Sequence, residues 1–345
     1  MKPSLPNTMR AVAVSQYGTQ LTLIETSVPT PKPDEVTIQV HTSGLCSTDL
    51  HLLSGMQSLG NLPRILGHEI AGAIVALGTN VRDWQIGNRV VVAIDVSCGK
   101  CLHCHTGQTQ RCPHKTRIGF ERDGGHADYV VVPANNLILL PDNISYEDAS
   151  ILPDAMACMY HCLVTQGQLR VNQKLVILGI GGLGIHGVQI ARLAGVEVVA
   201  TSRRAHRLLA AREFGALAVN PNQEDLAKIV YDFTGGSGAD VVADCIGTTA
   251  SIQEGLSLLR PGGKLLAIAY IDEVFQIPSI PLFSVEKEII GCRGSTKQEL
   301  IEVVNLVSQG KLKSVVGAKY PLSQIQQAVT LLEAGDVLGR IVLTR

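Results

Sequence analysis

The stretch that decides the fold of the second half of the chain runs from Lys174 to Ala194 and reads KLVILGIGGLGIHGVQIARLA. It begins as an apolar strand and ends with apolar side chains at helical spacing. Glycines at the strand–helix junction follow the pattern G-x-G-x-x-G, which lets the backbone turn tightly and approach a pyrophosphate at the helix N-terminus. A ligand-free glycine-rich turn is the alternative for the motif alone. The candidate phosphate-binding residues are Gly179, Ile180, Gly181, Gly182, Leu183 and Gly184.

From about Pro153 onward, strand patterns alternate with amphipathic helix patterns, as in VEVVATS and RAHRLLAAREF. This alternation is typical of βαβ units and predicts an α/β domain with a doubly wound parallel sheet over residues 153–292. Further strands are expected at 240–246, at 264–270 after the turn RPGGK, and in the segment that ends EIIGC.

The strand that follows the glycine turn ends without a carboxylate. Enzymes that prefer NAD usually carry Asp or Glu there to bind the ribose hydroxyls, whereas this strand ends Thr201-Ser202-Arg203-Arg204. Guanidinium and hydroxyl groups suit the additional 2′-phosphate of NADP, so NADP is favoured over NAD. The expected contacts are Ser202, Arg203 and Arg207, and the alternative is that the arginines are solvated charges at a helix start.

The first half of the chain shows short strand patterns separated by turn residues, for example at 35–41, 70–77 and 89–94. This pattern predicts an all-β domain. Residues from 296 onward hold two helical stretches and a closing strand, GRIVLTR.

Four cysteines follow the first-half strands in the run CGKCLHCHTGQTQRC. The spacing C-x2-C-x2-C-x7-C lets four thiolates converge on one tetrahedral zinc ion, which predicts a structural zinc lobe at about 95–115. Reduced thiols, two disulfides or a nucleic-acid-binding zinc ribbon are the alternatives, although a ribbon usually lies beside a basic surface. The predicted ligands are Cys98, Cys101, Cys104 and Cys112.

Composition excludes some partners. The 345 residues are 46% hydrophobic with a formal charge of -1, so nothing favours binding to nucleic acid or to an anionic membrane. The start MKPSLPNTMR has no apolar signal core, and no apolar run is long enough to span a membrane. Nine cysteines without a leader fit a reducing, cytoplasmic location.

The segments GLCSTDLH, which ends at His51, and GHE, which ends at Glu69, place a thiol, a hydroxyl, carboxylates and imidazoles in the β-domain. With them the chain resembles the zinc-dependent alcohol dehydrogenases of the medium-chain dehydrogenase/reductase superfamily. The resemblance also covers the cysteine lobe, the GG-x-A-x-Y pattern at 124–129, the glycine turn and the final Gly339-Arg340. It implies a GroES-like catalytic domain over 1–152, a Rossmann domain over 153–292 and a chain end, 293–345, that returns to the catalytic domain.

The resemblance also implies a catalytic zinc bound by Cys46 and His68, with Glu69 as an occasional ligand. The third protein ligand falls at Asp154, where many members of the family have cysteine; this chain reads DAMACMY from that position. Carboxylate is an accepted zinc ligand. The alternative is that Asp154 caps a helix after Pro153.

By the same resemblance, zinc lowers the pKa of a bound alcohol and Thr48 takes its proton. The proton continues along the cofactor ribose to His51 at the surface, while hydride passes to the nicotinamide. Asp49 is expected to accept a hydrogen bond from His68, and Arg340 to contact the cofactor phosphates. The family's aromatic pocket walls correspond here to Leu53 and Ala93, so the expected substrates are medium-sized primary or simple secondary alcohols.

Other interpretations stay open at this point. A polyol, threonine or formaldehyde dehydrogenase shares the zinc site, and a catalytically idle nucleotide sensor shares the fold. The resemblance implies two zinc ions per chain and a homo-oligomer, either a tetramer or a dimer. The histidines expected to be surface or packing residues are His41, His126, His161, His186 and His206.

Overall fold

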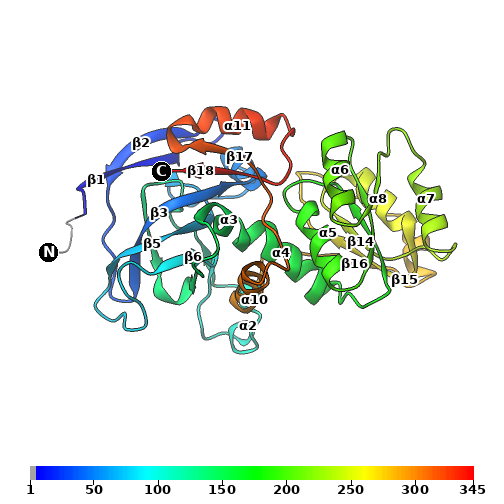
Figure 1. Ribbon diagram of the computed structural model, residues 1–345, viewed down its shortest axis with the longest axis horizontal. Coiled ribbons are helices and arrows are strands. Elements are labelled where there is room, and N and C mark those ends of the chain that lie inside the picture. The colour runs from blue at the N-terminus through cyan, green and yellow to red at the C-terminus, as the bar shows by residue number, and fades with distance from the viewer. Residues whose placement is uncertain (1–4) are drawn as a thin grey trace. The chain divides into compact units, whose positions relative to one another are not determined.

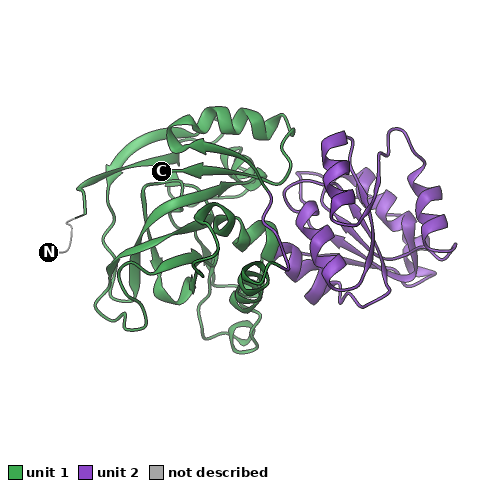
Figure 2. Ribbon diagram, in the orientation of Figure 1, with its two compact units in different colours: residues 1–157, 294–310, 316–345 green, residues 158–293, 311–315 purple. Residues whose placement is uncertain are grey.

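The computed structural model describes residues 5–345 as two compact units. Unit 1 comprises the chain up to Ala157 together with Gly294–Gly310 and Val316–Arg345, and unit 2 comprises Cys158–Arg293 and Lys311–Val315 (Figure 2). Unit 1 is therefore built from both parts of the chain that flank unit 2. The domain ranges given above remain predictions; the units divide five residues later than 152.

Unit 1 is mainly β (Figure 1). Its largest sheet has the order β10-β6-β5-β3-β18-β17, and β9 also pairs with β3. A second sheet has the order β2-β1-β4, and β7 pairs with β8. The strands are β1 (Thr8–Val14), β2 (Thr22–Ser27), β3 (Glu35–Leu45), β4 (Arg64–Ile65), β5 (Glu69–Leu77), β6 (Arg89–Val92), β7 (Asp95–Val96), β8 (Thr116–Arg117), β9 (Tyr129–Pro133), β10 (Leu137–Leu139), β17 (Val316–Pro321) and β18 (Arg340–Thr344).

The register of three strands brings distant segments together. Gly44 of β3 pairs with Glu69, the first residue of β5, and Leu45 pairs with Ile341, the second residue of β18. The end of β3 and the starts of β5 and β18 therefore meet at one edge of the sheet. The strand patterns expected in the first half are confirmed, with β3 extending to Leu45 and β6 ending at Val92.

Short helices connect these strands. A single π-helical turn, Leu152–Met156, precedes α4 and carries Asp154. The helices are α1 (Ser47–Leu53), α2 (Leu102–His105), α3 (Tyr146–Ser150), α10 (Lys297–Ser308) and α11 (Ile325–Glu333). Helix α4 (Ala157–Tyr160) begins at the last residue of this part of unit 1 and continues in unit 2.

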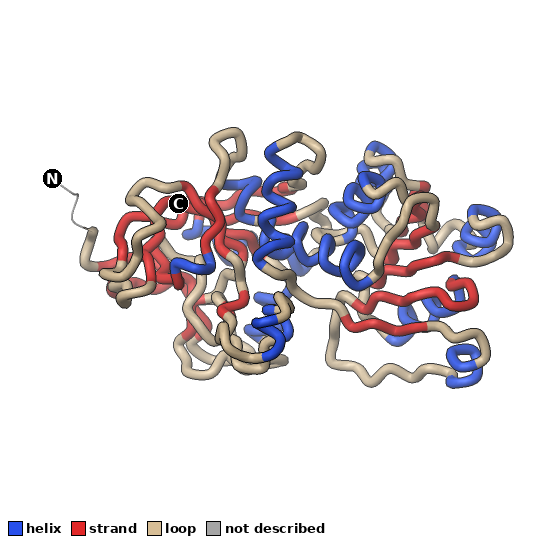
Figure 3. Tube along the Cα trace, turned by 90° about the horizontal axis from the view of Figure 1, so that it is seen from below, coloured by secondary structure: helices blue, strands red, loops and turns tan. Residues whose placement is uncertain are grey.

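Unit 2 contains a six-stranded sheet in which every pair is parallel, in the order β13-β12-β11-β14-β15-β16. Figure 3 shows its strands in red with helices in blue around them. The order reverses direction between β11 and β14, which is the switch point of a doubly wound sheet. The elements are β11 (Lys174–Leu178), α5 (Gly184–Leu193), β12 (Glu197–Thr201), α6 (Ala205–Glu213), β13 (Leu217–Val219), α7 (Leu226–Phe233), β14 (Ala239–Asp244), α8 (Thr249–Leu258), β15 (Leu259–Ala267), α9 (Ser279–Phe283) and β16 (Glu288–Gly291).

The predicted α/β fold class, with a β-domain and a doubly wound parallel sheet, is confirmed. One detail differs. The segment RPGGK was expected to be a turn before a strand, but β15 already begins at Leu259. Its register with β14 jumps from Leu259 to Lys264, so the glycines form a bulge within the strand.

Candidate active site

The start of α1 fixes the position of Cys46. Cys46 has extended backbone dihedrals and is the N-cap of the helix, and Asp49 stands at the third helical position. The Asp49 carboxylate accepts a hydrogen bond of 2.9 Å from the Cys46 N–H, which satisfies an amide that the helix start would otherwise leave unpaired. The spacing C-x-x-D thus aims the Cys46 thiol from a rigid corner between β3 and α1.

Three predicted ligands converge in unit 1. Cys46 Sγ lies 3.6 Å from Asp154 Oδ2, and His68 Nε2 lies 3.8 Å from the same oxygen. One ligand atom from each of the three residues lies within 4.8 Å of the others. A tetrahedral zinc ion with ordinary bond lengths separates such ligands by about 3.4 to 3.6 Å. The donor set of one thiolate, one imidazole and one carboxylate therefore fits zinc and leaves a fourth position open.

Arg340 and Glu69 lie beside this cluster. Arg340 Nε donates to Glu69 Oε1 over 3.0 Å, and its Nη2 donates to Asp154 Oδ2 over 2.5 Å. Glu69 Oε1 also accepts from the Ala155 N–H at 3.2 Å. Glu69 is fully buried, and burial raises its pKa to about 7 even though Arg340 opposes this change. In this arrangement Glu69 lies outside the three-ligand cluster and pairs with Arg340.

Glycine makes room for that carboxylate. A Cβ atom at Gly44 would lie 1.8 Å from Glu69 Oε2, so any larger residue there would displace the Glu69 carboxylate. Arg340 was expected to contact cofactor phosphates; its guanidinium is instead engaged by two carboxylates, and its side chain is 7% exposed. The phosphate contact stays a prediction.

The alternative role for Asp154 is that of a helix cap. Its carboxylate contacts Cys46, His68 and Arg340, all through Oδ2. Burial raises the pKa of Asp154, but His68 and Arg340 outweigh it and the net shift is downward. The side chain is thus an ionised member of the cluster, and the N-cap of its turn is Ile151.

Asp49 faces two histidines. Its Oδ1 lies 3.8 Å from His68 Nδ1, and its Oδ2 lies 3.7 Å from His126 Nε2. At 3.8 Å the expected hydrogen bond from His68 is not formed, and the two groups lie within ion-pair distance. Burial raises the pKa of Asp49, but His126, His68 and the Cys46 amide together bring it below its usual value. His126 was expected to be a surface or packing residue; it is fully buried against this carboxylate.

The two residues expected to relay a proton lie on α1. Thr48 and His51 are separated by three positions, which puts them on the same helix face. His51 is half-buried, and burial lowers its pKa. An imidazole that is neutral near pH 7 can accept a proton.

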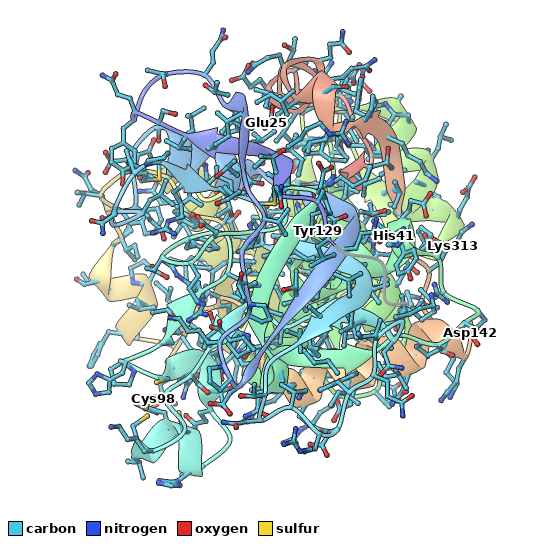
Figure 4. The ribbon with its side chains drawn as sticks, turned by 90° about the vertical axis from the view of Figure 1, so that its left-hand side faces the viewer. Glu25, His41, Cys98, Tyr129, Asp142 and Lys313 are labelled. Carbon is cyan, nitrogen blue, oxygen red and sulfur yellow. The ribbon has the colours of Figure 1, made fainter. Side chains whose placement is uncertain are left out.

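The four remaining predicted zinc ligands form a separate cluster around α2 in unit 1. All four sulfur atoms lie within 4.8 Å of one another, with Cys98 and Cys101 at 3.9 and 3.5 Å from Cys104. Four sulfurs around one zinc ion lie about 3.8 Å apart. The hydrogen bond from the Lys100 amide is the main cause that lowers the pKa of Cys98 to about 6. All nine cysteines are free thiols, so the structure contains no disulfide among these four residues. Figure 4 labels Cys98 in this loop.

The glycine turn lies at the carboxyl end of β11 in unit 2. Gly179 has a φ of 96°, which other residues rarely adopt. A Cβ at Gly184 would lie 2.1 Å from the Gly179 carbonyl oxygen, whereas a Cβ at Gly181 would meet nothing within 4 Å. The backbone conformation of the turn therefore requires glycine at 179, and close packing requires it at 184. Gly181 instead leaves open space beside its backbone.

The predicted ribose-binding residues follow β12. Ser202 is buried, and its Oγ accepts from the Arg204 N–H at 3.1 Å. Arg203 is exposed and Arg207 is half-buried. No carboxylate belongs to this strand end, where the sequence is Thr201-Ser202-Arg203-Arg204.

The other histidines have structural contacts. His41 is exposed and stacks on Tyr146 at a ring distance of 4.1 Å (Figure 4 labels His41). His186 is buried, pairs with the Gly182 carbonyl at 2.7 Å, and accepts from the Val315 N–H at 3.1 Å. His161 is buried and His206 is exposed. These four match the surface or packing role expected for them.

Family models match both units. Residues 32–142 match the alcohol dehydrogenase GroES-like domain, and residues 182–309 match the zinc-binding dehydrogenase family. In the part of the chain that the structure describes, no helix has the length and apolar character needed to cross a membrane.

Similar proteins match nearly the whole length of the chain. An alcohol dehydrogenase of Geobacillus stearothermophilus is 32% identical over 97% of this chain and 99% of its own. A D-arabitol-phosphate dehydrogenase of Enterococcus avium is 31% identical over 96% of both chains. A crystal structure of an NAD-dependent alcohol dehydrogenase superposes with a TM-score of 0.92 at 30% identity, covering 98% of this chain and all of the other. The chain belongs to the zinc-dependent dehydrogenases of the medium-chain dehydrogenase/reductase superfamily.

Proposed function

We propose that this chain is an NAD(P)-dependent zinc alcohol dehydrogenase that interconverts medium-sized primary or simple secondary alcohols with their carbonyl products. The observation that carries the proposal is the convergence of Cys46, His68 and Asp154 with ligand spacing suited to one zinc ion and with the fourth position left open. A zinc ion held there would act as a Lewis acid that lowers the pKa of an alcohol hydroxyl. The nicotinamide cofactor would supply the hydride acceptor.

The residues around this position have distinct tasks. Asp49 orients the His68 ring through the contact at Nδ1, so that Nε2 faces Asp154. Arg340 donates to Asp154 and Glu69, which fixes both side chains in place and helps to keep Asp154 ionised. Positioning of this kind is a large part of catalysis because misplaced groups cost rate steeply.

Proton removal falls to α1. The Thr48 hydroxyl accepts the substrate proton and releases its own, and His51, one turn further on, is the base that takes it toward solvent. Burial lowers the pKa of His51, which keeps the ring neutral and ready to accept a proton at pH 7.

The cofactor would bind at the glycine turn of unit 2. The open side of Gly181 leaves room for a pyrophosphate near the start of α5, where the positive end of the helix dipole favours an anion. Ser202, Arg203 and Arg207 favour NADP over NAD, because a hydroxyl and two guanidinium groups replace the usual acidic residue. Two zinc ions per chain are proposed, one at the three-ligand cluster and one at the four cysteines.

The proposal is tested by initial rates on a panel of alcohols, polyols, threonine and formaldehyde adducts with each pyridine nucleotide. Faster turnover of medium-sized or aromatic primary alcohols, or of simple secondary alcohols, than of ethanol, the polyols and threonine supports it, and a kcat/KM series that peaks at ethanol contradicts it. Preference for a polyol, a polyol phosphate or threonine would move the chain to another branch of the same family. Cys46→Ser serves as the inactive control, and Cys162→Ser, a buried thiol outside both clusters, as the matched active one.

A further inference from the structure

His126 lies in a buried chain of polar contacts behind the three-ligand cluster. Its ring is fully buried, and its backbone is fixed by hydrogen bonds with Val12 and Leu66. A Cβ at Gly67, the residue before His68, would lie 2.5 Å from His126 Nδ1. The absence of a side chain at Gly67 thus allows the imidazole to approach the cluster.

The contacts of Ser43 decide which nitrogen of His126 carries the proton. Ser43 Oγ lies 2.9 Å from His126 Nδ1 and accepts a hydrogen bond of 3.0 Å from Arg345 Nη2. A guanidinium only donates, so the Ser43 proton has one acceptor among these contacts, which is His126 Nδ1. A neutral His126 ring therefore carries its own proton on Nε2. Burial is the main cause that lowers the pKa of His126, which keeps the ring neutral.

Arg345 holds this end of the chain of contacts in place. Besides Ser43, its guanidinium donates to the carbonyl oxygens of Gly125 and Ala127, the two neighbours of His126. The segment that carries His126 is thus tied down on both sides, and the imidazole has little freedom to turn away.

The opposite face of the ring meets Asp49. His126 Nε2 lies 3.7 Å from Asp49 Oδ2, and the other oxygen of that carboxylate lies 3.8 Å from His68 Nδ1. Asp49 is fully buried, and its one hydrogen bond from a backbone amide comes from Cys46. Both distances exceed that of a hydrogen bond, so the two imidazoles act on this buried carboxylate electrostatically. The two rings face different oxygens of Asp49.

We infer that His126 is a positioning residue for the metal site: its Nε2–H faces Asp49 and holds that carboxylate where it aligns the His68 ring. This inference rests on the proposed zinc site. It adds to that proposal a residue that touches neither metal nor substrate and acts through Asp49 on the tautomer of His68. Direct partners of a metal ligand, the position that Asp49 holds beside His68, typically change the affinity for the metal by about 10- to 100-fold when they are replaced. His126 lies one contact further out, so its effect is expected at the lower end of that range.

The test is a Co²⁺ titration of the metal-free full chain, followed by visible absorption, with His126→Phe and His126→Gln. Phe keeps the ring volume and loses both nitrogens, whereas Gln places an amide N–H near the position of Nε2. The expected result for His126→Phe is unchanged binding at the cysteine lobe and binding at the Cys46 site that is weaker by about 10-fold, the lower end of the range for direct partners of a ligand. His126→Gln should recover most of that loss.

Equal affinity in wild type and His126→Phe would overturn the inference, as would a Gln variant no better than the Phe variant. Failure of the wild type to bind a second Co²⁺ ion would instead overturn the proposed zinc site. If His126→Phe loses the lobe signal as well, the imidazole ¹⁵N spectrum of the wild type decides. The inference is supported if His126 carries its proton on Nε2 in the wild type and shows mixed tautomers in Ser43→Ala. It is refuted if His126 carries its proton on Nδ1 in the wild type.

Discussion

Arg340 Nε and Glu69 Oε1 form an ion pair of 3.0 Å between residues 271 positions apart in the chain. The pair exists because β3 lies between β5 and β18 in the sheet. The starts of β5 and β18 therefore lie on either side of the end of β3. Both side chains are shielded from solvent, at 7% and 0% exposure. The pair thus ties the end of the chain to the predicted metal site, and its loss should affect both stability and metal binding.

Replacing Arg340 with Met should lower the free energy of unfolding by about 3 to 5 kcal/mol, because it leaves two shielded carboxylates without their cation. Urea denaturation of the metal-free chain measures this. The matched control is Arg10→Met, which breaks a pair with Asp128 in which the arginine is 55% exposed, and an exposed pair of this kind contributes at most about 1 kcal/mol. Similar losses in the two variants would contradict the structural role given to Arg340.

Replacing Asp154 with Ala should reduce the zinc content from about two ions per chain to about one, because the cluster loses one of its three ligands. Asp154→Cys should retain both ions, since thiolate is an equally good zinc ligand. Elemental analysis after dialysis measures the content. An Ala variant that still holds two ions would remove Asp154 from the ligand set and return it to a structural role.

Replacing Cys112 with Ser should release the ion of the cysteine lobe and leave the Cys46 site filled. Cys112 is buried and its sulfur accepts from the Cys98 N–H, so its loss also removes a contact that closes the loop. We expect faster proteolysis within 95–115 and one ion fewer per chain, as measured by mass spectrometry and metal analysis. Cys162→Ser alters a thiol that belongs to neither cluster, so it should change neither the rate of proteolysis nor the metal content.

Replacing Ser202 with Asp should shift the ratio of kcat/KM for NADP over NAD toward NAD by at least about 10-fold, because a carboxylate there repels a 2′-phosphate and binds ribose hydroxyls. Arg207→Ala should lower kcat/KM for NADP and leave that for NAD nearly unchanged. Lys228→Ala is the control, because Lys228 is an exposed cation on α7, the next helix along the chain. An unchanged ratio in both test variants would leave these residues without a role in cofactor choice.

Replacement by Ala should lower stability at Gly184 and cofactor affinity at Gly181. At Gly184 the new methyl group would overlap the Gly179 carbonyl oxygen at 2.1 Å, and forced overlap of this kind costs about 1 to 3 kcal/mol of stability. At Gly181 the methyl group meets no protein atom, so thermal stability should hold while the Kd of the dinucleotide rises. Calorimetry and cofactor titration separate the two effects. Loss of stability with unchanged cofactor affinity in Gly181→Ala would place the pyrophosphate elsewhere.

The sequence was sufficient where function depends on neighbours in the chain. The four lobe cysteines lie within fifteen residues, and the glycine turn within six, so spacing alone constrains how they can meet. The outer glycines were recognisable because turn geometry and close packing require them locally. The fold class followed from the change from a two-residue period to alternating strands and helices.

The tertiary structure alone revealed the pairing of Arg340 with Glu69 and Asp154, and the place of His126. A single histidine inside a GG-x-A-x-Y pattern carries no local signal that separates packing from positioning, and the one hint was the glycine before His68. Those contacts join segments far apart in the chain, and they form because strand register brings β3, β5 and β18 to one edge. Short-range patterns determined the elements and the local ligand groups, whereas burial and register decided which charged side chains face one another.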